Sequence, residues 1–285
     1  MANREIIWVS SLDNANSNKI NLLENSMSDF YRNSANYYSD IDFTADNWVN
    51  TGEKGYADII ETCRNTDKIL EVGCGSANIL KHGMIGQSKY FGCDFSEELI
   101  KSNKASYSLA NFDVLTKPNF LPYADNTFDV VYSVFVIEHS CYPAKFIDEC
   151  CRVLKQNGTL IILCPDFLGR GRMSSQRAGY TQGTTTDKLR KMKVIDAIVT
   201  YYDNKIRIPA HCKSIASDRT PKFYINLQPT VFTDKFIPDV DAVYLTYKQE
   251  MQAYLMGKMQ LMENDGGLQK YEQERKLIYL KMKKG

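Results

Sequence analysis

Three acidic residues stand where each could close a predicted β-strand, and their side chains could bind one extended polar ligand. Glu71 lies in the apolar run 69–72, Asp94 follows Glu71 by 23 residues, and Asp113 follows Asp94 by 19 residues. Since the carboxyl ends of parallel strands meet at one edge of a sheet, we expect the three carboxylates along that edge. Carboxylate oxygens accept hydrogen bonds from ammonium and hydroxyl groups. The sequence therefore predicts a binding edge rather than an isolated acid.

The acid at the end of the second predicted strand, Asp94, has two interpretations. A carboxylate at this tip can accept both hydroxyls of a ribose. It could instead cap the helix that follows, which opens with Phe95 and Ser96. Because Ser96 is itself a good cap residue, we favour ribose binding for Asp94.

Two glycines, Gly73 and Gly75, directly follow the strand that contains Glu71. Glycine has no Cβ atom and tolerates positive φ, so such a turn lets backbone N–H groups approach a ligand closely. A tight strand-to-helix turn without a ligand has the same pattern. A dinucleotide is disfavoured, because Glu71 would repel its pyrophosphate and Asn78 follows where the third glycine of that motif is missing. A ligand with an ammonium and a sulfonium, S-adenosylmethionine (SAM), fits better.

The segment Glu71-Val-Gly73-Cys-Gly75-Ser-Ala77 resembles the first motif of the class I SAM-dependent methyltransferases, Glu/Asp-x-Gly-x-Gly-x-Gly. Ala77 replaces the last glycine of that motif, a change from one small residue to another. Residues 121–129 resemble a second stretch found in small-molecule methyltransferases, and residues 135–139 resemble a third. The resemblance covers residues 54–164 and, more loosely, residues 222–247, and it implies that the cofactor is SAM.

The resemblance also assigns the adenine end of the cofactor. It implies that Asp113 bonds the adenine amino group and that the backbone N–H of Val114 meets a ring nitrogen. We expect further cofactor contacts from residues that adjoin the motifs: Cys74, Phe95, Ser133, Val134 and Phe135.

The loop after the fourth predicted strand holds the candidate base, His139. The loop begins Ser133-Val-Phe135, so it lacks the Asn/Asp-Pro-Pro-aromatic motif of nucleobase amino methyltransferases and the Pro-Cys nucleophile of cytosine-carbon enzymes. A catechol-type enzyme needs metal-binding acids after this strand and the next, and Asp166 is the candidate available, so that class is disfavoured and we expect no metal site. A histidine, with an ordinary pKa of about 6.5, accepts a proton near neutral pH.

In sugar O-methyltransferases similar to this chain, a histidine after the fourth strand is the base and an acid after the fifth strand supports it. The resemblance implies these roles for His139 and Asp166. Alternatively, His139 only hydrogen-bonds within the fold. His211 is a second candidate base.

The expected function is SAM-dependent O-methylation of a small sugar. The basic residues between 168 and 222 favour an anionic acceptor, either phosphorylated or nucleotide-linked, over nucleic acid. Two alternatives stay open. An RNA methyltransferase would use the same basic residues, although the cluster has few aromatic side chains for base stacking. A non-catalytic SAM-binding scaffold would bind the cofactor but offer no acceptor pocket.

The composition places few demands on partners or compartment. The 285 residues are 44% hydrophobic and carry a net charge of +1, so nothing global requires nucleic acid or a membrane. The eight cysteines lack C-x-x-C spacing and indicate buried thiols in a reducing compartment. Because no apolar segment reaches about 18 residues and no charged leader precedes one, we expect a cytoplasmic protein without a membrane span.

Strands and helices must alternate from residue 68 to residue 164 to position these side chains. Apolar runs of strand length predict strands at 69–72, 90–94, 108–114, 128–134 and 159–164. Helical spacing predicts helices at 55–64 and 143–154. This alternation predicts an α/β fold with a doubly wound parallel sheet. The resemblance implies a Rossmann-like sheet of seven strands, with a helical cap insertion and helical termini.

The chain is expected to have five parts. They are an N-terminal lid or extension at 1–53, the SAM-binding core at 54–164, a basic substrate cap at 165–221, the final antiparallel strands of the core at 222–247, and a helical tail at 248–285. Residues 168–222 contain twelve Lys or Arg and four Asp, a local excess of 12 − 4 = +8, which could equally be a solvated face. Within the cap, residues 184–202 are predicted to form one helix. The apolar residues of the tail pack either on the core or on a second subunit of a homodimer.

Overall fold

The computed structural model describes most of the predicted core and parts of both flanks. The residues described are 6–9, 25, 28–29, 31–32, 47–137, 140, 142–166, 185–202, 205–206, 223–226, 243–245, 251–252, 255–256, 258–262 and 266–285. The proposed lid falls largely outside these residues.

The described strands form a seven-stranded sheet and a separate three-stranded sheet. In spatial order, the large sheet contains β4 (Asn111–Val114), β3 (Tyr90–Asp94), β2 (Ile69–Val72), β5 (Phe128–Val134), β6 (Leu154–Pro165), β10 (Leu277–Lys284) and β9 (Met259–Leu261). Strands β4 to β6 are parallel, whereas β10 runs antiparallel to both of its neighbours. This arrangement confirms the predicted doubly wound α/β sheet of seven strands.

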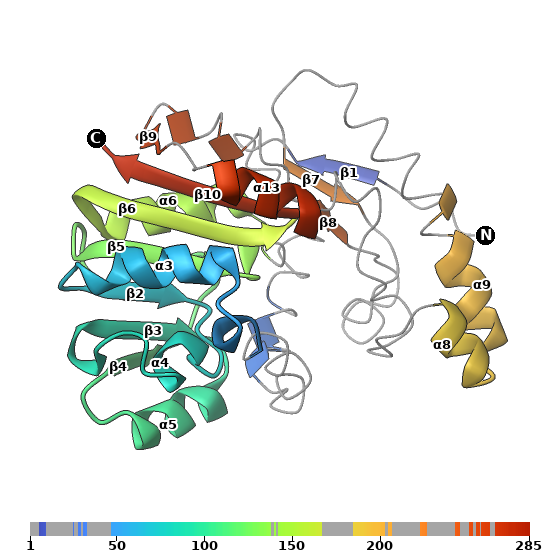
Figure 1. Ribbon diagram of the computed structural model, residues 1–285, viewed down its shortest axis with the longest axis horizontal. Helices are drawn as coiled ribbons and strands as arrows, with labels where there is room; N and C mark the ends of the chain where they lie inside the picture. Colours follow the sequence, from blue (N-terminus) through green and yellow to red (C-terminus); the bar gives the residue numbers. More distant parts are fainter. Residues whose placement is uncertain are drawn as a thin grey trace.

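Helices cover both faces of the large sheet (Figure 1). One face carries α3 (Lys54–Arg64), α4 (Asn78–Lys81), α5 (Glu97–Ser106) and α13 (Gly266–Arg275), and the other carries α6 (Pro143–Val153). A short 3₁₀ helix, η1 (Gln87–Lys89), precedes β3. Successive strand residues alternate between the two faces, so Ile69 packs under α3 while Leu70 packs on the α6 side. Because both faces are buried, the central strands are nearly continuous apolar runs.

The predicted final strand pair is wrong. Residues 223–227 and 242–247 do form strands, β7 (Phe223–Asn226) and β8 (Val243–Leu245), but these belong to the small sheet. Strand β7 pairs there with β1 (Ile6–Val9), which the sequence did not predict.

The last two places in the large sheet are taken by the predicted helical tail, residues 248–285. Strand β10 pairs along its length with β6, from Leu277 opposite Pro165 to Lys283 opposite Thr159. Side chains of β10 alternate between the cores, with Tyr279 on the α3 side and Leu280 on the α6 side. A strand buried on both faces is a continuous apolar run, which periodicity cannot distinguish from a buried helix. The boundaries predicted at 222–247 and 248–285 are therefore corrected.

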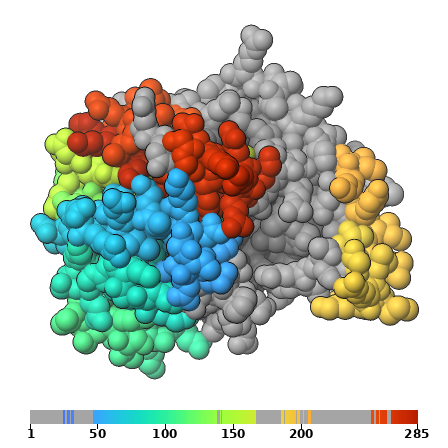
Figure 2. All heavy atoms as spheres, in the orientation of Figure 1, coloured from blue at the N-terminus to red at the C-terminus, as the bar shows by residue number. Residues whose placement is uncertain are grey.

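The insertion forms a helical hairpin instead of the single helix predicted over 184–202. Helices α8 (Thr185–Arg190) and α9 (Val194–Tyr202) are separated by a turn in which Met192 has a φ of 57°. A positive φ is incompatible with a continuous right-handed helix. The hairpin lies at one end of the molecule, away from the large sheet (Figure 2). None of the helices among the described residues combines the length and apolar character needed to cross a membrane.

Candidate functional site

The turn between β2 and α4 requires glycine at its first position. Gly73 has a φ of +75°, and a Cβ atom added there would lie 2.3 Å from Cγ2 of Val136. Gly75 also has a positive φ of 48°, and Ala77 adopts the left-handed conformation just before α4. The predicted glycine turn is therefore needed both for backbone conformation and for close approach of the loop after β5.

Hydrogen bonds fasten this turn to the tip of β3. The backbone N–H groups of Gly73 and Cys74 both donate to the carbonyl oxygen of Cys93, at 2.8 and 3.0 Å. The N–H of Gly75 donates to Oδ2 of Asp94 at 2.9 Å. The side-chain amide of Asn103 donates to the carbonyl of Gly75 at 2.8 Å. The backbone of the turn is thus held from both sides.

Asp94 is buried at the carboxyl end of β3, where both of its oxygens are engaged. Oδ1 accepts the backbone N–H of Ser96 at 2.9 Å, while Oδ2 accepts that of Gly75. Ser96 itself accepts the N–H of Leu99 at 3.4 Å, which confirms Ser96 as the cap of α5. Each oxygen of an ionised carboxylate can accept more than one hydrogen bond, so a carboxylate that holds two backbone N–H groups can also accept from the hydroxyls of a ribose.

Glu71 lies beneath the turn, among tyrosines of the α3 side of the sheet. Its Oε2 accepts hydrogen bonds from the hydroxyls of Tyr90 and Tyr132, the latter at 2.9 Å. Burial raises the pKa of Glu71 to about 7, although both tyrosine hydrogen bonds lower it and the charge of Asp94 raises it further. The sequence did not predict these tyrosines. Tyr132 is the register partner of Glu71 on β5, 61 residues away, so the pairing of the strands and not a local pattern brings them together.

Asp113 and Val114 end β4 directly beside the tip of β3. The strand register places Asp113 opposite Cys93 and Val114 opposite Asp94. Both side chains are half-buried. Burial, followed by the charges of Cys93 and Asp113, raises the pKa of the Tyr123 hydroxyl above its usual range.

The structure thus places two of the three predicted acids together at strand ends, and the third acid makes its contacts within the sheet. Asp94 and Asp113 lie at neighbouring strand ends, whereas the Glu71 carboxylate bonds tyrosines within the sheet. Phe95, also predicted to contact the cofactor, is half-buried beside the core on the α6 side.

The end of β5 holds the remaining predicted cofactor residues. Ser133 is buried, and its Oγ has no hydrogen-bond partner among the described residues. Val134 and Phe135 are half-buried and pack on the α3-side core. Phe135 has a φ of 57°, and its N–H donates to the carbonyl of Leu163 at 2.8 Å. The ring of Trp48 lies 5.4 Å from the ring of Phe135, so the segment before α3 covers this strand end.

The predicted catalytic pair is described only in part. His139 and the second candidate, His211, lie outside the described residues. Asp166 directly follows β6, and its N–H donates to the carbonyl of Lys276 at 3.0 Å. Because β5 and β6 are parallel neighbours, Asp166 and the loop after β5 leave the sheet at the same edge.

Two buried side-chain oxygens at this end of the sheet have no hydrogen-bond partner among the described residues. Buried side-chain oxygens without a partner in the described part of the chain include Oγ of Ser133, on β5, and Oδ1 of Asn78, at the start of α4. A buried polar atom without a hydrogen bond is costly, so each of these atoms favours a polar ligand or water nearby.

Across the described ranges, no group of three or more His, Cys, Asp or Glu side chains could hold a metal ion.

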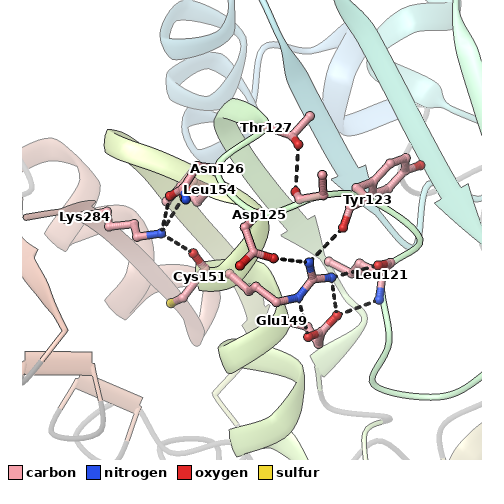
Figure 3. A network of polar contacts seen from close by, with 11 residues as sticks. Leu121, Tyr123, Asp125, Asn126, Thr127, Glu149, Cys151, Leu154 and Lys284 are labelled. Carbon is pink, nitrogen blue, oxygen red and sulfur yellow. Dashed lines mark hydrogen bonds and ion pairs between the residues drawn. The ribbon is translucent and has the colours of Figure 1, made fainter.

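The segment 121–127 before β5 is fixed by Arg152 near the end of α6. The guanidinium pairs with Glu149 through two contacts of 2.8 Å and donates to the carbonyl oxygens of Leu121 (2.9 Å) and Tyr123 (2.8 Å). Glu149 in turn accepts the N–H of Leu121 at 2.9 Å (Figure 3).

This network extends to the C-terminal strand. Arg152 also pairs with Asp125 at 2.8 Å, and Lys284 of β10 donates to the carbonyls of Cys151 and Leu154 at 2.8 and 2.7 Å. The sequence indicated the motif at 121–129 but not that Arg152 holds it in place. Glu149 and Arg152, which are three residues apart on one helix, could have indicated an ion pair at this position.

Comparison with known proteins agrees with this architecture. Residues 70–162 match a family described as a methyltransferase domain. A probable S-adenosylmethionine-dependent methyltransferase of Mycobacterium tuberculosis is 27% identical over 154 residues, covering 53% of this chain and 54% of the relative. Another, from Mycolicibacterium smegmatis, is 29% identical over 121 residues, covering 42% of this chain and 46% of the relative. The chain thus spans about half the length of these curated relatives.

Among solved structures, a SAM-dependent methyltransferase from Thermotoga maritima matches with a TM-score of 0.49 and 15% identity. The match covers 92% of this chain and 100% of that chain.

Proposed function

Because residues 70–162 form a domain of the SAM-dependent methyltransferase family, we propose that the whole chain transfers the methyl group of SAM to a small acceptor. The observation that carries this proposal is the hydrogen bond between the glycine turn and Asp94. There the backbone of Gly75 and the carboxylate at the tip of β3 are held together at 2.9 Å. The N–H groups of Gly73, Cys74 and Gly75 are held within the protein, and the two glycines carry no side chain, so a ligand can approach the fixed backbone of the turn closely.

The proposed cofactor contacts follow from the places of the residues. Asp94, at the carboxyl end of β3, would accept hydrogen bonds from the ribose hydroxyls while it holds the backbone of Gly75 and Ser96. Asp113 and the N–H of Val114 would bind adenine at the next strand end. When bound, SAM supplies a methyl group that its sulfonium has already activated. The chain has to position the acceptor in line, exclude water and remove a proton.

We further propose that the acceptor atom is a sugar hydroxyl oxygen and that His139 removes its proton. An alcohol is barely ionised near neutral pH, so oxygen methylation benefits most from a positioned base. The place of His139 in the chain supports this role, since it follows β5 by five residues, and Asp166 follows β6 at the same edge. The twelve basic residues between 168 and 222 favour an acceptor with a phosphate or nucleotide group.

A transfer assay tests this proposal. The full chain is incubated with isotopically labelled SAM and, in parallel, with neutral sugars, sugar phosphates, nucleotide sugars and bulk RNA. We expect label in a phosphorylated or nucleotide-linked sugar. Transfer only to RNA would contradict the acceptor class. Binding of SAM without transfer to any acceptor would point to a non-catalytic scaffold.

The role of His139 is tested by substitution. His139→Asn is expected to slow transfer by about 100-fold or more, because the amide cannot accept the proton. Calorimetric affinity for SAM should stay unchanged in this variant, which separates loss of the base from loss of the cofactor site. His211→Asn serves as the matched control and is expected to retain the wild-type rate. A wild-type rate in His139→Asn would remove the proposed base.

A further inference from the structure

The α8–α9 hairpin leaves much of its apolar surface uncovered. Exposed apolar side chains on it are Leu189, Met192, Val194, Ile195, Ile198 and Tyr201. The exposed fractions reach 83% for Met192, 78% for Ile195 and 63% for Ile198. Ala197, by contrast, is buried. The hairpin therefore leaves most of its large apolar side chains exposed to solvent.

The exposed residues of α9 form one stripe. Val194, Ile195, Ile198 and Tyr201 recur at the spacing that places side chains on the same face of a helix. Met192, in the turn, continues this surface at the tip of the hairpin. An uncovered apolar stripe of this size is unusual on a protein surface and marks an interaction site.

The tip of the hairpin carries exposed basic residues. Arg190, Lys191 and Lys193 are all exposed at this end, next to Met192 and Val194. From residue 187 to residue 196 the sequence contains four basic residues and two acids, so this segment has a net positive charge. The hairpin thus combines the apolar stripe of α9 with basic residues at its tip, and this combination is typical of segments that lie in the interface of a membrane.

Location supports the same partner. The hairpin lies at one end of the long axis of the molecule, and the large sheet lies toward the other end (Figure 2). A flat surface could therefore contact the hairpin without meeting the helices of the core. Aliphatic side chains such as Ile195 and Ile198 gain nothing from stacking on bases, which argues against RNA. Pairing of two copies through this face would bring like charges together, which argues against self-association.

We propose that the α8–α9 hairpin binds the surface of an anionic lipid bilayer. The stripe Val194, Ile195, Ile198 and Tyr201 enters the boundary between headgroups and acyl chains, and Lys191 and Lys193 contact the lipid phosphates. This contact does not depend on the methyl acceptor, so it can be tested without an activity assay.

Flotation with vesicles provides the test. The full chain is mixed with vesicles of phosphatidylcholine containing about one third phosphatidylglycerol, or with vesicles of phosphatidylcholine alone. We expect the protein to float with the anionic vesicles and to bind the neutral ones at least tenfold more weakly, since basic residues near an anionic surface contribute most of the attraction. Raising the salt concentration should weaken the binding. A wild-type chain that stays soluble with anionic vesicles, or that binds both kinds equally, would overturn the proposal.

Paired variants separate the two contributions. Ile195→Gln/Ile198→Gln removes the apolar stripe, Lys191→Glu/Lys193→Glu removes the charge, and each is expected to weaken vesicle binding by about tenfold or more. Leu109→Asn changes an exposed leucine outside the hairpin and should float like the wild type. Calorimetry with SAM checks that each variant keeps a folded cofactor domain. If the Ile195→Gln/Ile198→Gln variant floated like the wild type, the proposal would be overturned. It would also be overturned if these substitutions abolished a dimer or an RNA complex and left vesicle binding unchanged.

Discussion

Glu71 was predicted to attract the positive end of the ligand, and the structure adds a proton equilibrium to that role. Its carboxylate is buried against Tyr90 and Tyr132, and its pKa is raised to about 7. Near neutral pH the side chain therefore exists in both protonation states. A small change in its surroundings, such as a bound cation, would shift the balance toward the charged form.

The raised pKa makes folding stability depend on pH. In the unfolded chain the ordinary value is 4.5, so between about pH 4.5 and 7 the folded state holds a proton that the unfolded state has lost. This contribution to stability is complete below pH 4.5 and disappears as the pH rises through about 7, a total of about 3 kcal/mol. Relative to Glu71→Gln, the wild type should lose roughly 2 to 3 kcal/mol of unfolding free energy between pH 5 and pH 8. Urea titrations at both pH values measure the difference, and parallel losses in the two proteins would contradict it.

Gly73 and Gly83 both have a positive φ, so substitutions at the two positions distinguish the cost of backbone strain from the cost of a steric clash. Gly73→Ala places a Cβ atom against Val136, whereas Gly83→Ala, at a φ of +65°, meets nothing within 4 Å. Both variants carry the cost of a left-handed alanine, about 1 kcal/mol. We expect a further loss of stability and of calorimetric SAM affinity only in Gly73→Ala, because the turn must move to admit the methyl group. Equal behaviour of the two variants would show that packing against Val136 is unimportant.

At the scale of elements, the segment 121–127 depends on a single side chain of a neighbouring helix. Arg152 connects Glu149 and Asp125 to the carbonyls of Leu121 and Tyr123. These contacts need the planar fork of a guanidinium, which a lysine ammonium does not reproduce. The segment in turn positions Tyr123, whose ring packs edge-on against Phe91 of β3 and Phe128 of β5, so α6 supports the neighbouring strands through this segment.

Arg152→Lys is therefore expected to lower stability by about 1 to 3 kcal/mol despite conserving the charge. It should also weaken SAM binding, because Tyr123 loses its support. Lys101→Gln, on the exposed side of α5, is the control and should change stability by less than about 0.5 kcal/mol. Chemical unfolding and calorimetry measure both effects. A neutral Arg152→Lys variant would mean that the pair with Glu149 survives as a simple ion pair.

For the molecule as a whole, the C-terminal strand β10 extends the large sheet beyond β6, far in sequence from the strands at its centre. Tyr279 of β10 is fully buried and donates a hydrogen bond to Asp58 of α3, 221 residues earlier. Lys281 pairs with the same carboxylate at 2.9 Å. The cofactor domain is thus closed by a strand that lies beyond the insertion and the small sheet.

Loss of this closure should destabilise the entire fold. Tyr279→Ala removes a buried aromatic ring and leaves a cavity between α3 and the sheet, so we expect a loss of about 3 to 5 kcal/mol. Lys283→Ala, on an exposed position of the same strand, should cost less than about 0.5 kcal/mol. Thermal unfolding distinguishes the two. A small effect of Tyr279→Ala would indicate that β10 is dispensable, as a peripheral tail would be.

The sequence by itself determined the local parts of this protein. The strands at 90–94 and 128–134, the turn at Gly73 and Gly75 and the cap at Ser96 all follow from short-range rules of periodicity, backbone conformation and hydrogen bonding. These rules depend on residues a few positions apart, so a single chain reveals them.

Only the tertiary structure decided which distant segments meet. It placed β10 rather than β7 and β8 in the large sheet, turned Glu71 toward two tyrosines of neighbouring strands, and anchored the segment 121–127 on Arg152. Strand pairing and side-chain burial join residues tens to hundreds of positions apart. The apolar run 277–280 could pack equally well as a strand or a helix until its partner β6 supplied the hydrogen bonds. Pairing free energy, gained only once the fold assembles, made that choice.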